Sequence, residues 1–195
     1  MSSDTKLGKR ARSRAALTKA AFELFQEKGI QRTSLEEVAA RAGMTKGAVY
    51  SSFRGKDDLV ATVMENEGIE PKPVFRPGMT LAEIYRAIGQ AVVEIMPTAH
   101  RYGALVAEFQ LYAITHETLR PRLSAYYTAA FEQAMAAGAA MDAGGATPSR
   151  TEVLTIQALI LGLVHQRLLT PELVTDADIM AVFERMGGTA QRSAR

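Results

Sequence analysis

The sequence predicts an all-α fold in two parts, a small N-terminal module and a larger C-terminal one. Apolar residues recur at helical spacing along most of the 195 residues, and no alternating strand pattern competes with them. Segments rich in glycine, proline, serine and threonine separate these stretches, as expected of loops between helices. Hydrophobic residues make up 47% of the chain, which is enough for a real core and argues against global disorder.

The N-terminal module begins with two helical patterns. The first ends at Gly29, where glycine suits the left-handed conformation of a helix cap. The second starts at a capping box, which either Thr33 or Ser34 can form with a glutamate three residues later. It stops at Gly43, after barely two turns. The inner faces of these two helices are expected to consist of Leu17, Ala21, Leu24, Phe25, Leu35, Val38, Ala39 and Ala42.

The segment that follows predicts a helix-turn-helix. Gly43 can adopt a positive φ in the turn, and Thr45 can cap a short third helix. Gly47 and Ala48 leave the surface of that helix nearly flat, so its backbone can approach another surface closely. Thr45 and Lys46 lie at its N-terminus, where hydrogen-bond donors and the dipole favour phosphate and base acceptors. The alternative is a packed helical joint without a ligand.

A fourth helix is expected to start at Lys56, with apolar residues on its inner side. A cation in the first turn opposes the helix dipole, at a cost of about a few tenths of a kcal/mol. Asp57 and Asp58 suit that turn, and Lys56 does not. Pairing with either aspartate would explain the lysine, and so would a bound phosphate.

The charge of the chain is unevenly distributed. Residues 1–66 hold twelve lysines and arginines against eight aspartates and glutamates, whereas the remainder holds eleven against thirteen. Residues 1–14 contain five basic residues and one acidic residue. A flexible basic arm on a mildly basic module is typical of polyanion binding, and a merely solvated tail is the alternative.

Residues from about Arg12 to Leu59, roughly a quarter of the chain, resemble the DNA-binding domain of the TetR family of bacterial transcriptional regulators. Many spaced positions agree together, which makes the resemblance specific. Members often carry histidine just before the phenylalanine that follows the third helix, where this chain has Ser52. The matching residues are Leu24-Phe25 with Gly29, Thr33 to Ala39, Ala42 to Tyr50, Phe53, and Lys56 to Leu59.

The resemblance implies a domain order. A flexible basic arm (residues 1–11) precedes a three-helix helix-turn-helix domain (12–56). A shared helix joins this domain to a larger α-helical ligand-binding and dimerisation domain (57–190), and a frayed tail (191–195) follows. The third helix would enter the major groove of a palindromic DNA operator. The DNA-binding residues implied are Thr33, Ser34, Thr45, Lys46, Gly47, Ala48, Tyr50, Ser52 and Lys56, with Lys9 and Arg10 from the arm.

The C-terminal part predicts five more helices. Pro97 is expected to stop the first, Pro121 suits the first turn of the third, and Gly187-Gly188 should fray the last. Either Asp176 or Asp178 is expected to cap the last helix. The expected spans are 80–96, 101–115, 121–141, 149–169 and from 176 or 178 to about 186.

The helix at 149–169 is apolar nearly all round, so it must be buried on more than one side. Gly162 in its middle costs about 1 kcal/mol relative to alanine, which a close helix crossing would justify. A homodimer formed by the last two helices and their symmetry mates would bury both apolar stripes, as the resemblance implies. A monomeric bundle is the alternative. The expected interface is Leu161, Gly162, His165, Ile179, Val182 and Phe183.

No catalytic constellation, metal site or cofactor motif is found in the sequence, so the chain is not expected to be an enzyme. The three histidines lie far apart and lack acidic partners at ligand spacing, and there is no cysteine. Aromatic residues gather in the middle helices, which favours a pocket for a small, rather apolar effector, with ordinary core packing as the alternative. The candidate pocket residues are Tyr85, Met96, Phe109, Tyr112, His116, Tyr127, Phe131 and Gln157.

We therefore expect a cytoplasmic, ligand-responsive regulator that binds double-stranded DNA, most simply as a repressor. The longest apolar run is Ala158 to Val164, far below the roughly 20 residues that span a bilayer, so no membrane partner is expected. Two alternatives remain, a DNA-organising protein without ligand control and a small α-helical enzyme with a basic tail.

Overall fold

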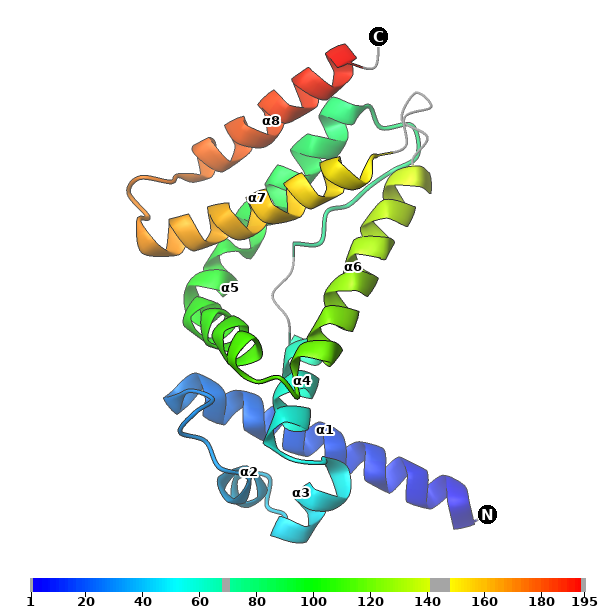
Figure 1. Cartoon of the computed structure of the whole chain (residues 1–195), viewed down its shortest axis with the longest axis vertical. Helices are drawn as coiled ribbons and strands as arrows, with labels where there is room; N and C mark the ends of the chain where they lie inside the picture. The colour runs from blue at the N-terminus through cyan, green and yellow to red at the C-terminus, as the bar shows by residue number, and fades with distance from the viewer. Residues whose placement is uncertain (1, 68–70, 141–147, 194–195) are drawn as a thin grey trace. The chain divides into compact units, whose positions relative to one another are not determined.

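The computed structural model describes residues 2–67, 71–140 and 148–193, which are helical and contain no strand (Figure 1). The all-α class predicted from the sequence is confirmed. The helices are α1 (Ser2–Lys28), α2 (Leu35–Arg41), α3 (Lys46–Ser52), α4 (Lys56–Glu67), α5 (Leu81–Thr115), α6 (Arg120–Ala140), α7 (Arg150–Leu169) and α8 (Asp176–Ser193).

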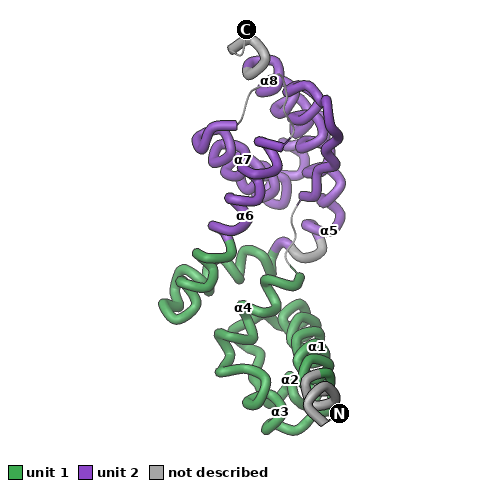
Figure 2. The backbone as a smooth tube through the Cα atoms, turned by 90° about the vertical axis from the view of Figure 1, so that its right-hand side faces the viewer, with its two compact units in different colours: residues 1–68, 104–126 green, residues 69–103, 127–195 purple. Residues whose placement is uncertain are grey.

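The chain divides into two compact units, which Figure 2 shows in green and purple. Unit 1 comprises residues 1–68 and 104–126, and unit 2 comprises residues 69–103 and 127–195. The domain boundary expected after residue 56 differs from this division. Unit 1 also contains α4, the end of α5 and the start of α6, because their apolar side chains pack on the N-terminal helices.

The core of unit 1 joins helices that are distant in sequence. Its centre is formed by the inner faces of α1 to α4, and the end of α5 covers them. The rings of Phe25 and Phe109 meet edge to face, with centroids 6.1 Å apart. The buried residues include Leu17, Leu24, Phe25, Val38, Val49, Phe53, Leu59, Val60, Val63, Leu105, Phe109, Tyr112, Leu119 and Leu123.

Local signals fix the ends of the short helices. Gly29 has a φ of 85° after α1, and Gly43 has a φ of 64° in the turn between α2 and α3. Ser34 forms the capping box of α2, since its hydroxyl accepts a hydrogen bond from the Glu37 amide at 3.2 Å. Of the two caps that the sequence allowed, the structure has the one formed by Ser34.

The arm expected to be flexible over residues 1–11 is instead part of α1, which starts at Ser2. This stretch contains no proline, and Gly8 is its one glycine. The guanidinium of Arg10 donates a hydrogen bond to the Ser51 carbonyl at 2.9 Å. A tertiary contact therefore supports a segment that composition alone marks as a tail.

In unit 2, the first part of α5 packs with α7 and α8 around an apolar cluster. Pro97 was expected to stop a helix, but it lies inside α5. Proline in a helix interior costs about 3 kcal/mol, yet the helix continues, and the neighbouring Met96 and Ala99 are buried. The fully or nearly fully buried members of the cluster are Ile84, Tyr85, Ile88, Val92, Met96, Ala99, Ile179 and Phe183.

The last helix also differs from expectation at both ends. Thr175, rather than Asp176 or Asp178, caps α8, because its hydroxyl accepts a hydrogen bond from the Asp178 amide at 3.2 Å. The helix continues past Gly187 instead of fraying there. Gly187 is buried, and a Cβ at this position would lie 3.0 Å from the Cα of Ala82, so close packing requires glycine.

Helix α7 has an unusual distribution of apolar surface. By length and composition alone it could cross a membrane, which for a single helix is weak evidence, and only 6% of its apolar window is buried. Ile156, Leu159 and Ile160 pack against the cluster of unit 2. Leu154 and Leu161 remain 45% and 48% exposed. Part of this helix is therefore left uncovered by the residues that the structure describes.

Candidate nucleic-acid interface

The third helix has one side in the core of unit 1 and the other in solvent. Val49 is fully buried, and Ser52 is 9% exposed. Thr45 precedes the helix with an extended backbone and makes no side-chain capping bond. Lys46 and Gly47 are exposed, and Tyr50 is 53% exposed. Ala48 is half-buried between the two sides. The structure thus brings a hydroxyl, a cation, a small residue and a phenol together on one exposed helical surface.

Lys46 already has a partner on the preceding helix. Its ammonium forms an ion pair with Glu36 of α2 and lies 5.8 Å from the centre of the Tyr50 ring. The hydrogen bond from Lys46 lowers the pKa of the Glu36 carboxyl, and the same bond raises the pKa of Lys46. Both side chains are more than half exposed, so water and salt weaken the pair. A polyanion can compete with Glu36 for this ammonium.

The cap of α2 uses the Ser34 hydroxyl. That hydroxyl donates to Glu37 at 2.8 Å, and the Glu37 carboxylate also pairs with Lys28. The hydrogen bond from Lys28, followed by those from the Ser34 amide and hydroxyl, lowers the pKa of Glu37 to about 2. Ser34 therefore stabilises the start of α2, and this role does not depend on the DNA contact expected from the sequence.

Three of the residues expected to bind DNA have other surroundings in the structure. Thr33 is 3% exposed and donates its hydroxyl hydrogen to the Gly29 carbonyl at 2.8 Å. Ser52 is buried on the core side of α3. Lys56 donates to the Gln31 carbonyl at 3.0 Å, and burial lowers its pKa. The Thr33 hydroxyl and the Lys56 ammonium thus have partners inside the protein, and Ser52 is buried, while a role of these residues in DNA binding stays a prediction.

The hydrogen bond from Lys56 to a carbonyl also explains why a cation lies in the first turn of α4. Neither an aspartate hydrogen bond nor a phosphate is needed to explain a cation in the first turn of α4. Its ammonium instead ties the start of α4 to the loop after α1. Sequence spacing gave no sign of this loop contact, because Gln31 lies 25 residues earlier.

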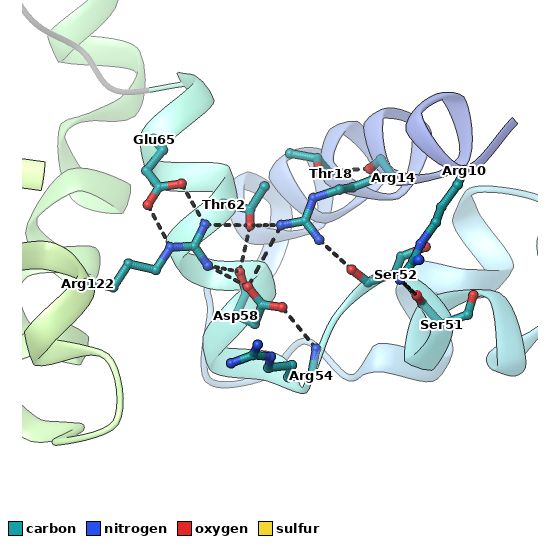
Figure 3. Close-up of polar contacts among 10 residues, drawn as sticks. All are labelled: Arg10, Arg14, Thr18, Ser51, Ser52, Arg54, Asp58, Thr62, Glu65 and Arg122. Carbon is teal, nitrogen blue, oxygen red and sulfur yellow. Dashed lines mark hydrogen bonds and ion pairs between the residues drawn. The ribbon is translucent and has the colours of Figure 1, made fainter. Parts of the chain in front are cut away.

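Three further basic residues, which were not among the DNA contacts expected from the sequence, have exposed side chains. Arg12, Lys19 and Arg54 are exposed, and no side-chain partner is recorded for them in the described parts of unit 1. Figure 3 shows the Arg54 guanidinium without an interaction, while its backbone amide donates to Asp58 at 2.9 Å. Arg54 lies in the turn after α3, a position that could have marked it as a phosphate contact. Lys9 was expected here too, but its side chain is outside the described residues.

The expected effector pocket is divided between the two units. Phe109, Tyr112 and His116 belong to unit 1. The Tyr112 hydroxyl donates to Asp57 at 2.8 Å, and the His116 ring stacks on Tyr112 at 3.6 Å. These three aromatics therefore pack on the N-terminal module. The other expected pocket residues belong to unit 2: Tyr85, Met96, Tyr127, Phe131 and Gln157.

Within unit 2 these five residues differ in exposure. Tyr85 and Met96 are buried in the apolar cluster, whereas Tyr127 is 49% exposed. Phe131 is half-buried, and the Arg150 guanidinium lies 4.9 Å from its ring centre. Gln157 on α7 is also half-buried.

The expected dimer interface requires a correction. Ile179 and Phe183 are fully buried in the cluster of their own unit, so they are not available to a second copy. Val182 and His165 are half-buried, while Leu161 and Gly162 are exposed. Periodicity identified the apolar face of α8 but not the helix that covers it, which is α5 of the same chain.

Comparison with known proteins matches part of the chain to a family. The family model described as bacterial regulatory proteins, tetR family, matches residues 17–63, from α1 through the helix-turn-helix into α4. Residues 17–63 thus match the DNA-binding region of the tetR family. The resemblance carried by the sequence is thus confirmed.

The matched relatives are named as regulators. The HTH-type transcriptional repressor Rv3405c of Mycobacterium tuberculosis is 30% identical over 111 residues, which are 55% of this chain and 59% of that protein. The chain thus spans about 59% of the length of this relative. The regulator AcrR of Shigella flexneri is 44% identical over 45 residues, 23% of this chain and 21% of that protein. The tetR family and these relatives are regulators and not enzymes, as predicted.

Solved structures share the fold over almost the whole chain. NalD of Pseudomonas aeruginosa, named as the secondary repressor of the MexAB-OprM multidrug efflux pump, is 26% identical. The match covers 92% of this chain and 96% of NalD, with a TM-score of 0.57. A transcriptional regulator from Rhodococcus is 21% identical, with coverage of 92% and 96% and a TM-score of 0.67.

Proposed function

We propose that this protein is a tetR-family repressor that reads a palindromic DNA operator with α3 and is released by a small, rather apolar molecule. The exposed surface of α3 is the observation that carries the proposal. Thr45, Lys46, Gly47 and Tyr50 face solvent there, while Val49 holds the helix on the core. Such a helix can enter the major groove with its small residues against the DNA.

The structure suggests a division of labour among the DNA contacts. Thr45 and Lys46 would meet base edges, with Gly47 and Ala48 allowing close approach. Lys46 would exchange Glu36 for a base acceptor, which makes its contribution depend on sequence. Arg54, together with Arg12 and Lys19, would bind phosphates in place of Thr33, Ser52 and Lys56, since these three cations are exposed and free of recorded partners in the described chain.

The exposed apolar stripe of α7 supports a homodimer. Leu154, Ala158, Leu161, Gly162 and His165 lie at helical spacing, and the first four of them are exposed. A second copy of the chain would cover this stripe. Two copies would also supply two recognition helices for operator half-sites about 34 Å apart. The proposed interface is therefore formed by the exposed part of α7, and not by α7 and α8 together as expected from the sequence.

The effector would bind in unit 2. Helix α6 has no buried residue between 127 and 140, although Tyr127, Phe131 and Met135 repeat at one helical spacing. This poorly covered aromatic face supports a site for an apolar molecule, with Gln157 and Arg150 as polar neighbours. The repressor names of Rv3405c and NalD support release as the regulatory outcome. We place the protein in the cytoplasm, where its DNA would be.

The test of DNA reading starts from a pool of random duplexes. The full chain should select a palindrome, and footprinting should protect two half-sites. Lys46→Ala should change the preferred bases, whereas Arg54→Ala should weaken all sequences alike and reduce the salt slope by about one. Lys72→Ala, which removes an exposed cation of unit 2, is the matched control and should change neither. Even, sequence-independent protection would contradict the proposal and support a DNA-organising protein.

Effector control has a separate test. A thermal-shift screen of small apolar compounds should identify a ligand of the free protein. By linkage, that ligand must bind more weakly when the selected operator is present, by the same factor by which it weakens operator binding. Equal ligand affinity with and without operator would show that the effector site does not control DNA binding. Turnover of the compound would support the enzyme alternative instead.

A further inference from the structure

The C-terminal end of α3 is held by guanidinium groups of α1. The last carbonyls of a helix have no partner within the helix and need one elsewhere. Arg10 donates to the Ser51 carbonyl at 2.9 Å, and Arg14 donates to the Ser52 carbonyl (Figure 3). Two arginines one helical turn apart therefore cap the end of the helix that we propose to read DNA.

Arg14 is fixed on several sides. Its second terminal nitrogen donates to the Thr62 hydroxyl at 2.8 Å and lies 3.8 Å from Asp58. Its guanidinium carbon stands 4.3 Å from the centre of the Phe53 ring. The side chain is 37% exposed. With its donors directed at α3 and α4, Arg14 is placed to orient α3 and not to reach a phosphate.

The same acceptors bind a second arginine, from the start of α6. Arg122 donates to the Thr62 hydroxyl at 3.0 Å and also to the Asp58 carboxylate. The Thr62 hydroxyl, which is itself a donor to the Asp58 carbonyl at 2.8 Å, lies between the two guanidinium groups. Thr62 is 6% exposed, so the bridge is shielded from water.

Arg122 is in turn oriented by Glu65. Two nitrogens of its guanidinium donate to the two Glu65 oxygens at 2.7 and 2.6 Å, the bidentate geometry that arginine favours. Two cations and two carboxylates balance in this group. A continuous chain of contacts therefore runs from Glu65 and Arg122 through Asp58 and Thr62 to Arg14 and the end of α3, all within unit 1.

We propose that Arg14 is a positioning residue for DNA specificity, which fixes the orientation of α3, and that Arg122 acts on α3 through it. The DNA part of this proposal rests on the proposed function. The alternative is that these arginines only add stability to the packing of α1, α4 and α6.

The first test needs no DNA. Amide hydrogen exchange of the full chain should be followed at residues 49–53, where the Phe53 amide donates to the Val49 carbonyl at 2.8 Å. Arg14→Gln should accelerate exchange there about tenfold, because a hydrogen bond to a charged donor is lost. Arg122→Gln should accelerate it about threefold, although Arg122 has no recorded contact with α3. Arg120→Gln is the matched control, since this neighbour pairs with Glu117 at 4.0 Å and should leave α3 unchanged.

The second test separates positioning from phosphate binding. Arg14→Gln should lower the affinity for the selected operator relative to a scrambled duplex about tenfold, with an unchanged salt slope. Arg14→Lys should fail to restore that ratio, because a lysine keeps the charge but lacks the fork that reaches two acceptors. Rescue by lysine together with a reduced salt slope for Arg14→Gln would overturn the proposal and make Arg14 a phosphate contact.

A milder pair of variants guards against loss of folding. Thr62→Val keeps the shape of the side chain but removes the bridging hydroxyl, and it should accelerate exchange at 49–53. Thr18→Val is its control, because the Thr18 hydroxyl is similarly buried and donates only to the Arg14 carbonyl at 2.9 Å. Unchanged exchange at 49–53 in both Arg14→Gln and Thr62→Val would refute the positioning role. If the wild-type chain selects no DNA sequence, the proposed function fails, and the exchange data still decide the positioning role.

Discussion

The two units are held together by different interactions. In unit 1, carboxylates and guanidiniums connect helices across the core: Glu108 accepts from the amides of Ile30 and Gln31, Asp57 accepts from Tyr112 and Thr118, and Arg122 donates to Asp58 and Glu65. In the described part of unit 2, an apolar cluster joins the helices, accompanied by exposed ion pairs such as Arg86 with Glu184.

This difference suits two kinds of task. Directional hydrogen bonds fix angles and distances, which a surface that reads DNA requires. Apolar packing is non-directional and tolerates changes of shape as long as volume is conserved, which suits a unit that accommodates a small molecule. Among the described residues, unit 2 leaves an apolar stripe on α7 exposed. Unit 1 also has exposed apolar side chains near the end of α5, Leu111 and Ile114, at 62% and 69%.

The largest effect is expected in the apolar cluster of unit 2. Phe183 is fully buried there. Phe183→Ala should lower the free energy of unfolding by about 3–5 kcal/mol, because it leaves a cavity in a packed core. Chemical denaturation of the full chain measures this loss. Leu173→Ala, at a position that is 70% exposed, is the control and should change stability little. A loss for Phe183→Ala no larger than that of the control would contradict the apolar basis of unit 2.

A smaller effect is expected on association. Beyond its chain neighbours and the nearby backbone of α7, a Cβ at Gly162 would meet no atom of the described residues within 4 Å, so Gly162→Leu should not destabilise the monomer. In a dimer through α7 the added side chain would overpack the interface by about 1–3 kcal/mol. Sedimentation over a concentration series should show a weaker dimer for this variant. Ala136→Leu on α6 is the control.

Two outcomes would break this argument. A wild-type chain that sediments as a monomer at micromolar concentration would remove the dimer, and with it the cover for α7. A Gly162→Leu dimer as tight as the wild type would leave the dimer intact but place its interface elsewhere.

The sequence predicted the parts of the fold that depend on local signals. The turn at Gly43 and the cap at Ser34 depend on residues within one or two helical turns, and both appear in the structure. The resemblance to the tetR family rests on the same short-range pattern. The position of α3, and therefore the exposed surface of Thr45 and Lys46, could be read before any tertiary contact was known.

The surroundings of several other residues depend on tertiary contacts, which the sequence pattern did not reveal. Nothing near Lys56 in the sequence indicates that the Gln31 carbonyl lies within reach of its ammonium. The sequence placed Phe183 at a dimer interface and Tyr112 in an effector pocket, because periodicity does not say which helix covers an apolar face. In the structure, Phe183 packs in the apolar cluster of unit 2 and Tyr112 in that of unit 1. Arg14 was seen as one charge of a basic tail, because its acceptors lie about 40 residues or more further on.

The smallest effect is expected at the directional contacts of unit 1. Tyr112→Phe removes the hydrogen bond to Asp57 and should cost about 1 kcal/mol near neutral pH. Burial acts to raise the pKa of Asp57, but the hydrogen bonds from Thr118 and Tyr112 outweigh it and hold the pKa below its ordinary value of 3.8. A carboxyl with a lowered pKa in the folded state stabilises the protein above its unfolded pKa, and this contribution is lost as the pH falls through the folded-state pKa.

The stability difference between wild type and Tyr112→Phe should therefore narrow as the pH falls from neutral through the folded-state pKa of Asp57, because the carboxyl is then protonated. Urea denaturation over a series of acidic pH values measures this difference. Tyr85→Phe is the control in unit 2, since Tyr85 is similarly buried and no hydrogen bond of its hydroxyl is recorded among the described residues. Its effect should depend less on pH in the acidic range. A cost of Tyr112→Phe that does not change with pH would show that the hydroxyl contributes through packing and not through Asp57. It would then no longer support the contrast between a unit 1 held by directional hydrogen bonds and a unit 2 held by apolar packing.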